Sequence, residues 1–198
     1  MSSLEIALRR LCDELVEATF RFALIGGLAV SVRSEPRFTR DADIAVALND
    51  DAEAEALVRD LQLKGYAVLD IIEQDAVGRL ATVRLQPPGE ARSGLVLDLL
   101  FASSGIEREV VESAETLEVL PGLTVPVART GHLIALKVLS RDDRTRPQDV
   151  GDLRALLDRA TPEEHDCARE ALRLIESRGF HRDRQLMPML DELIAEED

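Results

Sequence analysis

Apolar positions change their spacing along this chain. Residues 3–19 place Leu4, Leu8, Leu11 and Leu15 at intervals of three to four, which predicts an amphipathic helix with a capping box from Ser2 to Glu5. Apolar runs bounded by turn residues then predict short strands, with helices expected after Gly27, from Asp50 and at 109–114. The predicted strands are 22–25, 44–48, 66–72, 79–85, 95–101 and 123–127.

After residue 130 the pattern is helical to the end of the chain. Breaks are expected at 144–147, near Thr161-Pro162 and at Gly179, where proline or glycine interrupts the period. The predicted fold class is therefore α+β, with a mixed β-sheet flanked by helices and a C-terminal helical part. We divide the chain into a core at 1–128 and a helical part at 129–198.

Composition narrows the class of protein. The 198 residues carry a formal net charge of −14, which disfavours broad adhesion to nucleic acid or to anionic membranes. No apolar run approaches the roughly 20 residues that span a bilayer, and the N-terminus lacks the pattern of a secretory signal. We therefore expect a cytoplasmic protein without a membrane partner. The two cysteines suggest neither a disulfide framework nor a metal site.

Two carboxylates stand at the start of a predicted strand. Asp41 and Asp43 are two residues apart, so both side chains leave the same face of the strand. Like charges so close must share a proton, remain solvated or find a cation, and a divalent metal removes the repulsion. By itself the pair is more typical of an acidic strand end in solvent.

A third carboxylate lies within an apolar strand. Asp98 interrupts the run 95–101, and a buried charge there must be protonated, paired or used on a metal. Arg84 on the preceding strand is the structural alternative, as an ion-pair partner. Three carboxylates on neighbouring strands would hold Mg²⁺ between themselves and substrate phosphates.

The turn Gly26-Gly27 follows a strand and precedes a helix. Glycines there allow backbone N–H groups to approach phosphates at a helix N-terminus, although a Gly-Gly pair alone is usually only a turn. Lys137 lies on the apolar side of a later helix, with Leu133 and Leu136, where it could contact a phosphate or pair with Asp152. We favour Asp152 over Asp149 as the residue that faces the site.

Arginines cluster on both sides of these motifs and are the candidate contacts for a polyanion. The alternative is that they neutralise neighbouring acids on solvated loops. The candidates are Arg33, Arg37, Arg40, Arg141, Arg144 and Arg146.

Four blocks in this order resemble the polymerase-β-like nucleotidyltransferase superfamily, and within it the AbiEii toxin branch of type IV toxin–antitoxin systems, which includes the MenT-like enzymes. The blocks are 26–30, 37–44, 133–137 and 146–153. The wider superfamily usually has Gly-Ser at the turn, whereas this chain has Gly27 in place of that serine. Ser31, one helical turn later, is a candidate replacement for its hydroxyl.

The resemblance implies an enzyme that uses NTP and two Mg²⁺ ions. Asp41, Asp43 and Asp98 would bind metal, Gly26 and Gly27 would bind the nucleotide, and Lys137 with Asp152 would complete the site. The implied activity is transfer of a nucleoside monophosphate, from a pyrimidine NTP in many relatives, to RNA such as the tRNA 3′ end. Such a toxin would block translation and growth and have a cognate antitoxin protein as partner.

Two other functions remain open from the sequence. The acidic character suits a cationic small acceptor, as in aminoglycoside nucleotidyltransferases, and a protein hydroxyl is a further acceptor of the same chemistry. A noncatalytic binding module of the same fold is the third reading. It is disfavoured because all the expected polar residues are present.

Overall fold

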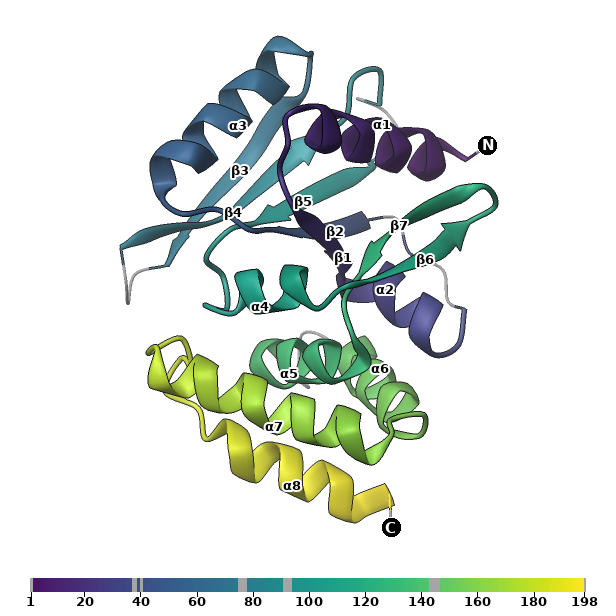
Figure 1. The fold of residues 1–198 in the computed structure, drawn as a ribbon, viewed down its shortest axis with the longest axis vertical. Helices are drawn as coiled ribbons and strands as arrows, with labels where there is room; N and C mark the ends of the chain where they lie inside the picture. The colour runs from purple at the N-terminus through teal and green to yellow at the C-terminus, as the bar shows by residue number, and fades with distance from the viewer. Residues whose placement is uncertain are drawn as a thin grey trace.

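The computed structural model describes residues 2–36, 39, 41–74, 78–90, 94–142 and 147–197, and is shown in Figure 1. Its helices are α1 (Ser3–Glu17), α2 (Gly26–Arg33), α3 (Asp51–Leu63), α4 (Glu107–Glu112), α5 (Thr130–Ser140), α6 (Pro147–Leu157), α7 (Pro162–Ser177) and α8 (Leu186–Glu197). Its strands are β1 (Phe22–Ile25), β2 (Asp41–Val46), β3 (Ala67–Gln74), β4 (Arg79–Gln86), β5 (Val96–Leu100), β6 (Glu115–Leu120) and β7 (Leu123–Val127).

Within the described residues, seven strands form one sheet in the order β3-β4-β5-β2-β1-β7-β6. The pairs β2–β5 and β1–β7 are parallel and the others antiparallel, so the sheet is mixed, as the sequence predicted. The register sets the site, because the parallel pairing of β2 with β5 places Asp43 directly opposite Asp98.

Helices cover both faces of the sheet. Figure 1 shows α1 and α3 on one side, and α2, α4 and the C-terminal helices on the other. Alternation along β2 separates the two faces, because Ala42 and Ile44 are fully buried whereas Asp41 and Asp43 leave the opposite side. The predicted cap of α1 is present, since the Ser2 hydroxyl accepts a hydrogen bond from the Glu5 amide at 3.2 Å.

The chain is helical after β7, as its spacing predicted. Pro147 and Pro162 stand at the first residues of α6 and α7, positions where proline needs no hydrogen-bond donor. The chain passes from β7 to α5 at Ala128 and Arg129, next to the predicted boundary at residue 128. Whether 1–128 and 129–198 behave as separate domains stays a prediction.

One strand was not predicted from the sequence. Residues 115–120 form β6, which pairs with β7 as an antiparallel hairpin across Pro121-Gly122. Its charged and apolar residues do not alternate cleanly, so the two-residue period is weak, although Pro-Gly is a turn signal that could have revealed it. Among the described helices, none is both long enough and apolar enough to cross a membrane.

Candidate active site

The Asp-x-Asp pair opens β2 on the face that α2 approaches. Asp41 is exposed at the first residue of the strand, and Asp43 is half-buried two residues later. On the neighbouring strand β1, Ile25 pairs with Asp43, so the turn after β1 reaches the same carboxylate. The structure thus brings the glycine turn and the acidic pair together, as their order in the sequence suggested.

Asp98 lies beside Asp43 on one side and Arg84 on the other. It is 8% exposed and stands opposite Asp43 across the β2–β5 pair and opposite Arg84 across the β4–β5 pair. Arg84 donates from Nε to Oδ1 at 3.0 Å and from Nη2 to Oδ2 at 2.8 Å. The ion pair considered from the sequence is therefore present, and it coexists with the juxtaposition of Asp98 and Asp43.

Gly26 is required at its position by both conformation and space. Its φ is +64°, in the left-handed region that glycine adopts without strain. A Cβ atom there would lie 1.8 Å from Oδ2 of Asp43, inside the carboxylate. The Gly27 backbone amide hydrogen-bonds the same carboxyl group, so the turn and the acidic strand fit against each other.

The carboxylates repel one another. Burial, followed by the nearby Asp98 charge, raises the pKa of Asp43, and Asp41 adds to this effect, whereas Lys137 and the Gly27 amide lower the pKa; the balance is a pKa of about 6. A divalent cation at this place would offset the repulsion, and carboxylate oxygens are the ligands that Mg²⁺ prefers. The residues fit such an ion by their chemistry, although the described residues contain no ready-made cluster of three metal-binding side chains.

Lys137 projects from α5 toward two acids on α6. Its Nζ lies 2.6 Å from Oδ1 of Asp149 and 2.7 Å from Oδ2 of Asp152. The side chains of Asp149 and Asp152 are 8% and 4% exposed, and Lys137 is the cation between them. The sequence favoured Asp152 over Asp149, but Asp149 contacts the lysine equally well. Oδ2 of Asp149 is buried without a hydrogen-bond partner.

The spacing places both acids on one face of the helix, because residues three apart lie side by side there. Asp152 was preferred because Asp149, near the helix N-terminus, could instead complement the helix dipole. Ser31, the candidate replacement for the missing turn serine, donates its hydroxyl to the Gly27 carbonyl at 3.0 Å. It thus contacts the glycine turn from within α2.

The candidate arginines have separate placements. Arg33 donates to the carbonyls of Ala128 and Val127 at 2.9 and 3.2 Å and pairs with Glu115 at 2.6 Å, so it ties α2 to the β6–β7 hairpin. Arg141 is half-buried at the end of α5, where its carbonyl accepts a hydrogen bond from Arg184. Four further candidates, Arg37, Arg40, Arg144 and Arg146, lie outside the described residues.

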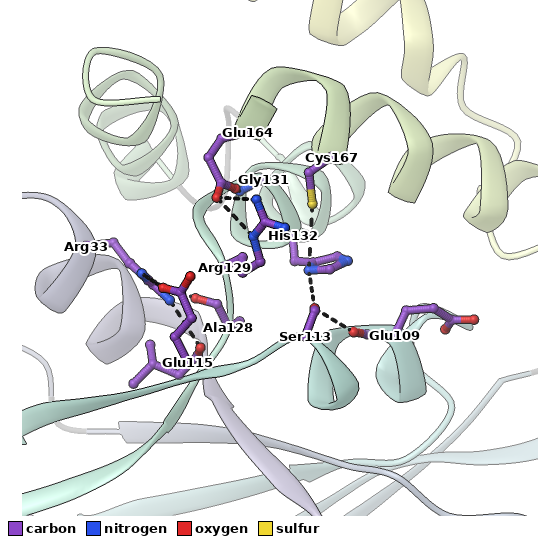
Figure 2. A network of polar contacts seen from close by, with 11 residues as sticks. Arg33, Glu109, Ser113, Glu115, Ala128, Arg129, Gly131, His132, Glu164 and Cys167 are labelled. Atoms are coloured by element: carbon purple, nitrogen blue, oxygen red, sulfur yellow. Dashed lines mark hydrogen bonds and ion pairs between the residues drawn. The ribbon is translucent and has the colours of Figure 1, made fainter. Parts of the chain in front are cut away.

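A second polar network joins the sheet to the C-terminal helices (Figure 2). Glu164 on α7 accepts hydrogen bonds from both Nε and Nη2 of Arg129 and from the Gly131 amide. His132 is 8% exposed, and its Nδ1 lies 3.2 Å from the Ser113 hydroxyl, with Cys167 at 3.9 Å. Burial lowers the pKa of His132, in keeping with a packing role for this histidine.

Comparison with known proteins identifies a family and a similar fold. The family described as "Nucleotidyl transferase AbiEii toxin, Type IV TA system" matches residues 7–198. A search of curated proteins finds no match to this chain. The crystal structure of an antigenic nucleotidyltransferase-like protein from Paracoccidioides brasiliensis has a similar fold, with a TM-score of 0.52 and 19% identity over 96% of this chain and 94% of that chain.

Two other solved structures are more distant. The antibiotic-resistance enzyme ANT(2″)-Ia in complex with adenylyl-2″-tobramycin has a TM-score of 0.48 and 16% identity over 100% of both chains. MenT4, a nucleotidyltransferase toxin from Mycobacterium tuberculosis H37Rv, has a TM-score of 0.39 and 14% identity over 97% of this chain and 91% of that chain.

Proposed function

Because the chain belongs to the AbiEii nucleotidyltransferase toxin family, we propose that it transfers a nucleoside monophosphate from an NTP to RNA, with the tRNA 3′ end as acceptor. The observation that carries the proposal is the set of acids at the glycine turn. Asp41 and Asp43 share a face, Asp98 stands opposite Asp43, and Gly26 abuts the Asp43 carboxylate. Holding divalent cations, that constellation would suit a reaction in which negative charge accumulates on phosphates.

Asp41 and Asp43 would hold Mg²⁺, with Asp98 as the third carboxylate. Bound there, two such ions would neutralise phosphate charge and stabilise the attacking and leaving oxygens of an in-line displacement. The carboxylates would fix the position of those ions, and thereby that of the α-phosphate relative to the acceptor hydroxyl. Their neighbours hold them in place, namely the Gly27 amide at Asp43 and the Arg84 guanidinium at Asp98.

Lys137 and the backbone of the glycine turn would bind the β- and γ-phosphates. An ammonium is a compact charge that suits the leaving pyrophosphate. Asp149 and Asp152 fix the position of Lys137 through contacts of 2.6 and 2.7 Å. These two acids therefore orient the lysine, and we assign them a positioning role.

A second acceptor class follows from the charge of the protein. The formal net charge of −14 attracts a cationic small molecule and repels RNA except at local basic sites. Transfer to a small cationic acceptor is therefore the alternative. It predicts activity that falls as salt screens the attraction between acceptor and protein.

The experiment that separates the two acceptors uses labelled nucleotides. The protein is incubated with each α-labelled NTP and Mg²⁺, with either total RNA or a set of aminoglycosides, and the same reactions are run with Asp43→Asn. Label on RNA that requires Asp43 supports the proposal. If only the small acceptors become labelled, RNA is not the acceptor and transfer to a small cationic molecule is the function.

A toxin role makes a separate prediction in cells. Expression of the chain alone is expected to arrest growth, and co-expression of a cognate antitoxin protein should relieve the arrest. The Asp43→Asn variant at the same protein level serves as the control. Arrest by that variant would show that growth inhibition does not come from nucleotide transfer.

A further inference from the structure

Charged side chains form a row across four strands of the sheet. Asp43 on β2 pairs in register with Asp98 on β5, Asp98 pairs with Arg84 on β4, and Arg84 pairs with Asp70 on β3. Since directly opposed residues of adjacent strands point to the same face, these four side chains share one face of the sheet. Asp98 lies between Asp43 and Arg84 in this row.

The geometry of the Arg84–Asp98 pair is specific. Two different nitrogens of the guanidinium each bind one carboxylate oxygen, at 3.0 and 2.8 Å, which fixes both the position and the rotation of Asp98. The Asp98 side chain is 11% exposed and that of Arg84 is 45% exposed. The acid is thus held inside the site by an arginine at the border with solvent.

Among the described residues, Lys137 is the other cation whose charge reaches Asp43, and it is already engaged. Lys137 contacts Asp149 and Asp152, and its positive charge is shared between those two acids. Arg84 is therefore the cation in direct contact with the third carboxylate. A carboxylate has about four acceptor positions, of which the arginine takes two, so Asp98 retains positions for a metal ion.

We propose that Arg84 is a positioning residue that keeps Asp98 oriented before metal binds, and whose positive charge holds the affinity of the free enzyme for divalent cations low. This inference rests on the proposed function, because it concerns the metal that the three carboxylates would hold. NTP brings its own negative phosphates, which offset the arginine charge, so that metal and nucleotide are retained together. An enzyme with this arrangement does not fill its site with metal alone.

The test measures Mn²⁺ binding by calorimetry, without nucleotide or acceptor. Arg84→Gln removes one positive charge beside a doubly charged ion and is expected to tighten Mn²⁺ binding by about tenfold or more. Arg84→Lys keeps the charge but loses the two-point contact, so its Mn²⁺ binding should be no tighter than that of the parent. Arg79→Gln is the matched control, because Arg79 is on the same strand and pairs with Asp51 at 3.0 Å, far along β4 from Asp98.

A purely structural role gives a different result. If Arg84 only braces the sheet, Arg84→Gln lowers the melting temperature and leaves the Mn²⁺ affinity equal to that of the parent and of Arg79→Gln. That result, or weaker binding in Arg84→Gln, would overturn the proposal. Should Arg84→Gln fail to fold, Arg84→Met, which also removes the charge, carries the test, since binding no tighter than in the parent counts against the proposal equally.

The location of the ion is checked with Asp43→Asn in the Arg84→Gln background. The tightened Mn²⁺ binding is expected to disappear there, and its persistence would overturn the proposal, because the ion would then lie elsewhere. None of these titrations requires catalysis. If labelled NTP is transferred to no acceptor while the Arg84 variants behave as expected, the proposed function fails and the role of Arg84 toward the metal stands.

Discussion

Replacement of Gly26 by alanine tests the contact between the glycine turn and the acidic strand. The new Cβ would lie 1.8 Å from Oδ2 and 2.5 Å from Cγ of Asp43, so the carboxylate has to move. Its hydrogen bond with the Gly27 backbone is then lost or weakened. Gly26→Ala should therefore reduce both stability and the ability of Asp43 to bind a cation.

The cost of the new side chain has two parts. An alanine at positive φ is strained by about 1–2 kcal/mol, of which roughly 0.4–1 kcal/mol is offset because the unfolded chain loses freedom. Displacement of Asp43 from its hydrogen bond adds about 1–3 kcal/mol. We expect the free energy of unfolding to fall by about 1–5 kcal/mol in total.

Gly122→Ala is the matched control. Gly122 has a similar φ of +71°, in the β6–β7 hairpin, but no heavy atom lies within 4 Å of a Cβ built there. Its substitution therefore measures the backbone strain without the clash. Urea denaturation of the parent and both variants gives the two free energies, and their difference is the contribution of the Asp43 contact.

Equal destabilisation by Gly26→Ala and Gly122→Ala would refute this reasoning, since the contact with Asp43 would then contribute nothing. Mn²⁺ titration supplies a second readout. Gly26→Ala should weaken binding whereas Gly122→Ala leaves it unchanged. Parental Mn²⁺ affinity in Gly26→Ala would show that the carboxylate has kept its working position.

Three further outcomes are expected. Asp41→Asn should abolish transfer because it removes a proposed metal ligand, while the melting temperature holds or rises because carboxylate repulsion is relieved. Near-normal transfer would count against a metal-binding role for Asp41. Lys137→Met leaves Asp149 and Asp152 buried without their cation and should lower the free energy of unfolding, measured by urea titration, by about 3–5 kcal/mol. Stability equal to that of the parent would show that this buried ion-pair network does not stabilise the fold. Glu164→Gln weakens the contacts with Arg129 and Gly131 and should cost about 1–2 kcal/mol in the same assay, whereas an unchanged midpoint would show that these contacts add nothing.

Local patterns predicted most of the secondary structure. The period of apolar residues located α1, the strands of the core and the C-terminal helices, because each element buries one face or one stripe. β6 was missed because Glu115 and Glu118 interrupt its pattern, and its pairing with β7 depends on the hairpin at Pro121-Gly122. Pairing partners of that kind are set by tertiary contacts, which no local period reports.

The sequence predicted the individual residues of the candidate site but not the contacts between them. The apolar setting of Asp98 indicated that this acid is protonated, paired or used on a metal, and Arg84 was named as one partner. Only the structure shows that Asp98 contacts Arg84 while standing opposite Asp43. In the same way, spacing placed Asp149 and Asp152 on one side of α6. The packing of α5 against α6 then brings both to Lys137.

The most direct test of nucleotide transfer compares two labels on the same NTP. The protein is incubated with Mg²⁺, total RNA and NTP labelled at either the α- or the γ-phosphate, with Asp43→Asn alongside. The account predicts that the α label enters RNA, that the γ label leaves as pyrophosphate, and that Asp43→Asn transfers neither. Entry of the γ label into RNA, or equal α labelling by Asp43→Asn, would contradict it.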